Sequence, residues 1–266
     1  MSRRSIGVVL VAAAAALALA GCGADRAGGS DAGPSAEPSD VTVYVVRHGE
    51  TVFNRIGVMQ GWSDSPLTPE GEDLADQAGE ALADHDFVAA YVSDLGRTRQ
   101  TAEHILAGQD DAPEPTYLPE LREWNFGGFE GNPNDDAWGT ALGEHGYEWS
   151  AVQADMGSFV ADVGSLTAVA DFFADSDPLG LAEDADAIRD RLAEGFGELI
   201  EDARAQGGGD VLVVSHGLAI GSLLEYLDPG FEPTQFHNLA LSVIEVDGGT
   251  TTIVSSNDTD YLDDAA

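Results

Sequence analysis

Lysine is absent from this chain of 266 residues, and all eleven of its basic residues are arginine. Aspartate and glutamate number 48, which leaves a formal net charge of −37. A surface this acidic repels nucleic acid and anionic lipid headgroups, so we expect neither as a partner. Because each arginine stands against a strongly negative background, a local cluster of arginines is expected to have a specific function.

Cysteine is nearly absent as well, since Cys22 is the only one, and the chain therefore forms no internal disulfide. Two arginines near the N-terminus precede an apolar run at residues 6–20, which is short for a membrane span. This run ends in Leu19-Ala-Gly-Cys22, which resembles the bacterial lipobox, where the cysteine is lipidated and becomes the mature N-terminus.

We therefore expect residues 1–22 to be a lipoprotein signal peptide; the alternative is a plain secretory signal with an incidental cysteine. Lipid on Cys22 would hold the protein at the extracytoplasmic face of the bacterial cell membrane, and no other membrane contact is expected. Residues 23–40 are rich in Gly, Ser, Ala, Pro and Asp, a composition that predicts a flexible linker.

The folded part is predicted at residues 41–266, where strand-like and helical patterns alternate. Apolar, β-branched runs predict strands at 41–46, 87–92 and 210–214, and residues 117–121 are expected to be extended. Helices are predicted from a Thr68-Pro69 start and at 96–106, 185–205 and 218–227, and a terminal hairpin at 241–246 and 251–255. This order predicts an α/β three-layer sandwich: a central, mostly parallel sheet with helices on both faces.

Two of the predicted strands end in the same way, one in Arg47-His48-Gly and the other in Ser215-His216-Gly. The carboxyl ends of parallel strands line the ligand crevice of such a sheet, so we expect the two histidines to face one another. A single histidine at a strand end is usually structural. Here Arg47 adjoins the first histidine, and Arg97 begins a predicted helix, where its planar fork adds to the positive end of the helix dipole. Together they favour a site for a tetrahedral dianion.

These residues belong to a longer series of motifs that resembles the signature of the histidine phosphatase superfamily, also called the phosphoglycerate mutase-like superfamily. The second histidine is followed by glycine and not by aspartate, which separates the chain from the phytase-like branch and indicates branch 1. In the order of the family, the matching pieces are Val46-Arg-His-Gly-Glu-Thr51, Asn54, Gln60-Gly61-Trp62 to Gly71, Ser93-Asp-Leu-Gly-Arg97, Leu121-Arg-Glu123 to Gly131 and Val214-Ser-His216-Gly217.

The resemblance implies a reaction centred on His48, the nucleophile that forms a phosphohistidine. His48 must be neutral, so its other ring nitrogen should donate to a backbone carbonyl. Glu123 resembles the proton donor of the family, which protonates the leaving oxygen and then takes a proton from the hydrolytic water.

Binding of the phosphate is implied for the cations and neutral donors around the nucleophile. Arg47, Arg97 and His216 are expected on the equatorial phosphoryl oxygens, where charge gathers in the transition state. Asn54 adds a neutral donor, and Gln60, Gly61 and Gly217 complete the expected substrate-binding set. No metal or other cofactor is expected, because the arginines supply positive charge and the sequence has no clustered Cys/His ligands.

Residues 132–184 lack a motif, and residues 131–184 are predicted to form a helical lid over the site. Between Glu123 and Ile188 there is neither arginine nor lysine, although a phosphoglycerate mutase needs extra cations for the second negative group of its substrate. We therefore predict a phosphomonoester phosphatase that acts on a small monophosphorylated substrate with a neutral or apolar leaving group. The alternatives are a phosphoglycerate-type mutase and a non-catalytic phosphate-binding lipoprotein.

Overall fold

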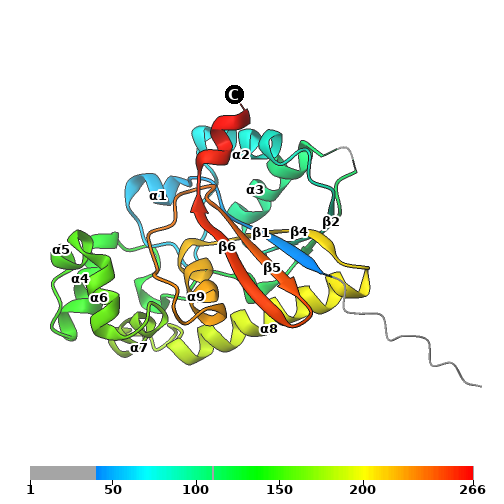
Figure 1. The fold of residues 1–266 in the computed structure, drawn as a ribbon. Coiled ribbons are helices and arrows are strands. Elements are labelled where there is room, and N and C mark those ends of the chain that lie inside the picture. Colours follow the sequence, from blue (N-terminus) through cyan, green and yellow to red (C-terminus); the bar gives the residue numbers. More distant parts are fainter. Residues whose placement is uncertain (1–39, 110, 266) are drawn as a thin grey trace, which may run out of the picture. The chain divides into compact units, whose positions relative to one another are not determined.

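The computed structural model describes residues 40–109 and 111–265, which contain one six-stranded mixed sheet (Figure 1). Four strands are parallel, β5 is antiparallel to β1, and β6 is antiparallel to β5, so the predicted terminal hairpin is confirmed. The signal peptide, Cys22 and nearly all of the linker lie outside the described residues. In order across the sheet, the strands are β3 (Pro115–Tyr117), β2 (Phe87–Val92), β4 (Gly209–Ser215), β1 (Val41–Arg47), β5 (Leu241–Asp247) and β6 (Thr250–Asp258).

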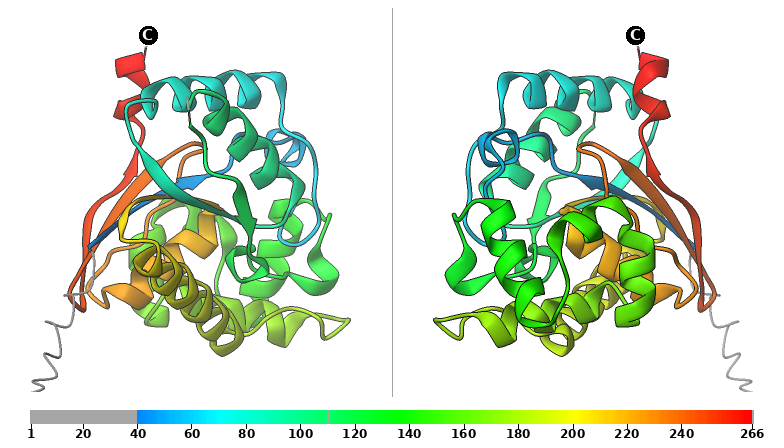
Figure 2. Two further views of the ribbon diagram at one scale, coloured as in Figure 1. Left: turned by 90° about the vertical axis from the view of Figure 1, so that its right-hand side faces the viewer. Right: turned by 90° about the vertical axis from the view of Figure 1, so that its left-hand side faces the viewer.

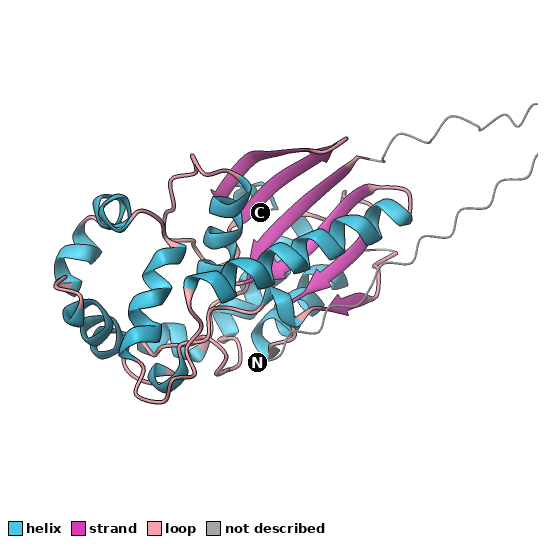
Figure 3. Cartoon of the chain, turned by 90° about the horizontal axis from the view of Figure 1, so that it is seen from below, coloured by secondary structure: helices cyan, strands magenta, loops and turns pink. Residues whose placement is uncertain are grey.

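Helices cover both faces of this sheet, which confirms the predicted α/β sandwich (Figure 2). On one face α2 (Pro69–Ala81) and α3 (Gly96–Ala107) bury the even-numbered side chains of the central strands, such as Val214. On the other face α8 (Ala185–Ala205) and α9 (Gly217–Leu227) bury the odd-numbered ones, and α8 lies over the sheet at a shallow angle to the strands (Figure 3). Burial on both faces explains why these strands are apolar without alternation.

The predicted extended segment at residues 117–121 is only partly correct. Strand β3 ends at Tyr117, and a 3₁₀ turn follows at Pro119–Leu121. Proline has no N–H to donate to a strand ladder and readily begins a helical turn, which accounts for the break. Further 3₁₀ turns lie at Gly127–Phe129, Thr167–Val169 and Asp260–Ala265.

Residues 131–184 fold mainly into four short helices that lie beyond the end of the sheet (Figures 1 and 3). Their aromatic and aliphatic side chains form a core of their own, which includes Phe173 and continues into α8 through Leu192. Within the described ranges no single helix is long and apolar enough to cross a membrane; one pair of lid segments, 156–163 and 167–176, reaches that length only with an 80° bend. The four helices are α4 (Asn134–Glu144), α5 (Trp149–Ala154), α6 (Met156–Val163) and α7 (Ala170–Ser176).

Candidate active site

The two strand-end histidines lie side by side because β1 and β4 are adjacent, parallel and in register. Arg47, the last residue of β1, pairs with Ser215, the last residue of β4. The backbone N–H of His48 then donates to the carbonyl of Ser215 at 3.0 Å, and the ring centroids of His48 and His216 are 5.2 Å apart. The sheet itself therefore brings together two residues separated by most of the chain.

His48 is held in the form that a nucleophile needs. Its Nδ1 lies 2.8 Å from the carbonyl oxygen of Gly49, so Nδ1 carries the proton and Nε2 keeps its lone pair. Burial lowers the pKa of His48 well below its ordinary value of 6.5, and the positive charges of Arg97 and Arg47 lower it further. At neutral pH the imidazole is consequently uncharged.

Arg47 supplies a cation with an unused donor next to this imidazole. Its Nη1 donates to the carbonyl of Phe236 at 2.5 Å, whereas its buried Nε has no hydrogen-bond partner among the described residues. Burial lowers the pKa of Arg47 to about 10, which still leaves the guanidinium charged at neutral pH. A Cβ on Gly217 would lie 3.3 Å from Nε, so glycine keeps this side of the guanidinium open. A buried unpaired cationic donor of this kind fits an anion.

Arg97 is fully buried in the first turn of α3 and binds the protein through all three of its nitrogens. Nη2 donates to the carbonyl of Gly61 at 2.7 Å, and Nη1 donates to the carbonyl of Ser63 and to Oδ1 of Asp64 at 3.0 and 2.9 Å. Its Nε donates to Nδ1 of His216 at 3.1 Å. Arg97 therefore joins the loop at residues 60–64 to the second histidine.

His216 is enclosed between Arg97 and Ser93. Because a guanidinium only donates, Nδ1 of His216 must accept, and Nε2 then donates to Oγ of Ser93 at 2.8 Å. Burial, followed by the charge of Arg97, lowers the pKa of His216 well below 6.5, so this ring is neutral as well. Both ring nitrogens thus bind protein groups, and the direct phosphate contacts expected for Arg97 and His216 stay predictions.

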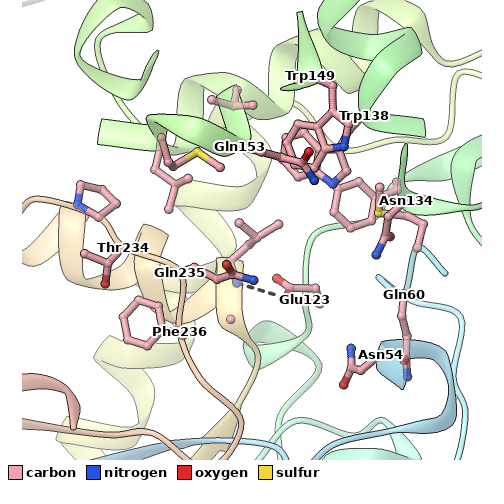
Figure 4. A pocket seen from close by; sticks show the side chains of 18 of the residues that line it. Asn54, Gln60, Glu123, Asn134, Trp138, Trp149, Gln153, Thr234, Gln235 and Phe236 are labelled. Carbon is pink, nitrogen blue, oxygen red and sulfur yellow. Dashed lines mark hydrogen bonds between the residues drawn. The ribbon is translucent and has the colours of Figure 1, made fainter. Parts of the chain in front are cut away.

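Asn54 and Gln60 border the site from α1 (Val52–Ile56) and the loop that follows it. Oδ1 of Asn54 accepts from the backbone N–H of Thr51 in a capping box, which turns the amide nitrogen toward the cavity (Figure 4). The side-chain amide of Gln60 lies 2.7 Å from Oγ1 of Thr51. Both side chains are therefore oriented by the same helix start.

Glu130 organises the loop that contains Gly61, a role that the sequence analysis did not assign. Its carboxylate accepts from the backbone N–H groups of Gly61, Trp62 and Ser63 and from Oγ of Ser63. Glu130 stands within one of the family-like motifs, but bonds to backbone N–H groups leave no pattern of their own in a sequence.

Glu123 lies at the N-terminus of α9 as a buried carboxyl group. Its Oε1 accepts from the backbone N–H groups of Trp124 and Ala219 at 3.0 and 2.8 Å, and Oε2 accepts from that of Leu218 at 3.1 Å. Burial raises the pKa of Glu123, although these N–H groups and Arg97 oppose the rise. Since Oε1 already has two donors, Oε2 has the lone pair that can hold a transferable proton.

A cavity of about 580 Å³ opens beside Arg47 and Glu123 and extends into the lid (Figure 4). Its lining does not include His48, Gly61, Arg97 or His216. Among the described residues that line it, Arg47 and Glu123 are the only charged ones, and Asn54, Gln60 and Gly217 also reach it. In the lid wall the indole rings of Trp138 and Trp149 are stacked with centroids 5.0 Å apart. The described residues contain no cluster of three or more His, Cys, Asp or Glu suited to a metal ion. The remaining lining residues are Val58, Met59, Phe126, Asn134, Gln153, Met156, Phe159, Leu166, Val169, Leu218, Pro233, Thr234, Gln235 and Phe236.

Comparison of the chain with models of known protein families identifies its family. The family model of the histidine phosphatase superfamily (branch 1) matches residues 43–165 and 165–259, and the chain belongs to that family. The resemblance noted from the sequence motifs is thereby confirmed.

Individual relatives and structural neighbours include both mutases and phosphatases. The probable phosphoglycerate mutase GpmB of Citrobacter koseri is 34% identical over 68% of this chain and 72% of its own length, and that of Erwinia tasmaniensis is 43% identical over 38% of this chain and 48% of its own. The crystal structure of phosphoglycerate mutase from Bacillus anthracis str. Sterne matches with a TM-score of 0.79 and 33% identity over 86% of this chain and 98% of that one. The α-ribazole phosphatase from Shigella flexneri shares the fold, with a TM-score of 0.61 and 24% identity over 82% and 96%.

Proposed function

We propose that the protein is a metal-independent phosphomonoester hydrolase that acts through a phosphohistidine at His48. The observation that carries the proposal is a neutral imidazole next to the buried Nε of Arg47: within the described ranges neither Nε2 of His48 nor Nε of Arg47 has a hydrogen-bond partner. The carboxyl group of Glu123, with its raised pKa, supplies the acid. Nucleophile, cation and proton donor are the three parts that phosphoryl transfer to histidine requires.

The reaction runs in two balanced steps. In the first, Nε2 of His48 attacks phosphorus, the bond from phosphorus to the leaving oxygen breaks, and Oε2–H of Glu123 protonates that oxygen. In the second, the Glu123 carboxylate takes a proton from water, the water oxygen attacks phosphorus, and the phosphorus–nitrogen bond breaks to release phosphate and neutral His48. Arg47 balances the charge that gathers on the equatorial oxygens.

The lining of the cavity supports a monophosphorylated substrate with a neutral or apolar leaving group. Its described lining residues offer no cation beyond Arg47 to a second phosphate or a carboxylate, and those of the lid wall are aromatic, aliphatic and amide side chains. A mutase remains the second candidate, because relatives that are a third identical to this chain are named probable phosphoglycerate mutases.

We also propose that the enzyme acts at the extracytoplasmic face of the bacterial membrane, held there by lipid on Cys22. The support is the charged, apolar and lipobox-like order of residues 1–22. Metabolic labelling with a fatty-acid analogue tests this directly: wild type should be labelled and Cys22→Ala should not, whereas label on both would point to a different site of attachment.

The reaction is tested by hydrolysis of p-nitrophenyl phosphate and of an alkyl phosphate by the purified protein in the presence of a chelator. We expect turnover by wild type, none by His48→Ala, and for Glu123→Gln a loss of about 10²–10⁴-fold on the alkyl ester, the usual contribution of general acid catalysis. His104→Ala is the matched control, because His104 pairs with Asp76 away from the site.

Three results would contradict the proposal. Turnover that persists without His48 would exclude the phosphohistidine, and loss of activity with chelator would exclude metal independence. A folded protein that is inert on every monoester but interconverts phosphoglycerates would favour the mutase.

A further inference from the structure

Arg191 on α8 donates all of its side-chain N–H groups, either to Glu183 or to backbone carbonyls of residues 120–123. Its Nε and Nη2 donate to the two carboxylate oxygens of Glu183, each at 2.8 Å. Its Nη1 donates to the carbonyls of Glu120 and Arg122, both at 2.8 Å, and Nη2 also donates to the carbonyl of Glu123 at 3.2 Å. A guanidinium has five N–H groups, and here five acceptors surround it.

Glu183 binds the same segment further along the chain, at the backbone of Asn125. Its Oε2 also accepts from the backbone N–H of Asn125, and its own N–H donates to the carbonyl of Asn125, both at 2.9 Å. Residues 120–125 are thus held at four positions by one arginine and one glutamate, and Nε1 of Trp62 adds a second donor to the carbonyl of Glu123. We call Arg191 and Glu183 the clamp.

We propose that Arg191, oriented by Glu183, is a positioning residue for the proton donor Glu123, an inference that rests on the proposed phosphatase reaction. The clamp holds the backbone carbonyl of Glu123 from α8, and the N–H groups of α9 hold its carboxylate. With backbone and carboxylate held independently, Oε2 has one location relative to the leaving oxygen. General acid catalysis depends on this geometry within fractions of an ångström.

The chemistry of the pair fits positioning better than simple stabilisation. Both side chains are only 14% exposed, and a buried ion pair contributes little net stability compared with well-packed apolar residues. Lysine cannot replace the arginine, because an ammonium has three donors on a flexible stem and lacks the planar fork that meets carboxylate and carbonyls together. The planar guanidinium of arginine is therefore required at position 191 to bind Glu183 and the backbone carbonyls together.

The test compares two leaving groups in Arg191→Gln and Arg191→Lys. An alkyl phosphate needs its leaving oxygen protonated, whereas p-nitrophenolate departs without a proton. We therefore compare kcat/KM, which reports formation of the phosphohistidine and not its hydrolysis. We expect kcat/KM on the alkyl phosphate to fall about tenfold to a hundredfold and kcat/KM on p-nitrophenyl phosphate to change by less than about threefold. Arg189→Gln is the matched control, because Arg189 stands two residues earlier on α8 and pairs only with exposed Asp186 and Asp190.

A double-mutant cycle with Glu123→Gln separates positioning from general loosening of the fold. If Arg191 acts through Glu123, adding Arg191→Gln to Glu123→Gln costs no further alkyl phosphatase activity. Equal losses of kcat/KM on both substrates, or losses that multiply in the double variant, would overturn the inference while leaving the phosphatase intact. A wild type inactive on both esters would instead contradict the proposed function itself.

Discussion

At the scale of single residues, burial determines the protonation states of the ionisable groups of the site, because it disfavours their charged forms. His48 is held neutral by a pKa well below 6.5, and Glu123 is held toward its protonated form by a raised pKa. Both shifts have desolvation as their largest cause, and in both it opposes the charged form. The nucleophile and the acid therefore coexist in their reactive forms at a pH between the lowered pKa of His48 and the raised pKa of Glu123.

The pH dependence of kcat/KM follows from these two directions, because kcat/KM reports the ionisation of the free enzyme. On the acid side, activity is expected to persist below pH 6.5 and to fall only as pH drops through the lowered pKa of His48. On the alkaline side, kcat/KM on an alkyl phosphate should fall as pH rises through the raised pKa of Glu123. Rate profiles of wild type and Glu123→Gln check this, and a variant that keeps the alkaline fall would show that another group is the acid.

Gly61 is predicted to tolerate no side chain. A Cβ there would lie 2.1 Å from the carbonyl oxygen of Trp124 and 2.3 Å from Oε1 of Glu130, so Gly61→Ala must displace the loop that Arg97 binds. We expect a loss of about 1–3 kcal/mol in unfolding free energy, measured with urea, together with lower activity.

Gly139→Ala is the matched control for that substitution. Gly139 lies inside α4 with open space around it, so alanine should stabilise the protein by about 0.5–1 kcal/mol through its higher helix propensity. Equal stability of the two variants would show that the close contacts at Gly61 relax without cost.

At the scale of elements, the parts that follow from sequence are those whose pattern is local. The helix at residues 185–205 and the strand at 87–92 match the observed bounds, and Thr68 caps α2 through Oγ1 as its Thr-Pro start predicts. Adjacent strand ends also made the meeting of His48 and His216 predictable.

What the sequence could not provide depends on contacts that leave no local pattern. The lid helices run from six to eleven residues and gain their order from distant packing, such as Trp138 against Phe173 with centroids 4.7 Å apart. Arg191 and Glu130 act on backbone groups, which every residue has, so residue identity reveals neither partner.

The described lid residues that line the cavity carry no charge, which leads to a gain-of-function prediction. Gln153 lies on α5 and lines the cavity, so Gln153→Arg would place a cation where a second anionic group of a substrate would lie. We expect kcat/KM for 3-phosphoglycerate hydrolysis to rise about twofold to fivefold relative to p-nitrophenyl phosphate, the range of a partly exposed ion pair.

Ser150→Arg adds the same charge to the exposed surface of the same helix outside the cavity and serves as the control. An equal rise in both variants would attribute the effect to net charge and not to the lid wall. No rise in either would contradict the view that missing cations limit the substrate range.

At the scale of the whole molecule, the imbalance of 48 acidic against 11 basic residues implies self-repulsion that salt can screen. We expect Tm to rise between about 10 mM and about 300 mM NaCl, a range over which the Debye length shrinks from about 30 Å to below 8 Å. Differential scanning fluorimetry measures this, with sucrose at equal osmolality as the uncharged control. A Tm that stays constant, or rises equally with sucrose, would contradict screening.

The start of α9 has one further consequence, since His216 is its N-cap and the N–H groups of Leu218 and Ala219 bind the Glu123 carboxylate. A phosphate dianion bound beside Arg47 would share this positive helix end with Glu123, and the two negative groups would repel each other. Phosphate binding would then draw a proton onto Glu123, and by reciprocity protonation would tighten phosphate binding. Release of product would be thermodynamically linked to loss of that proton, so the enzyme would retain phosphate more strongly as its surroundings become acidic.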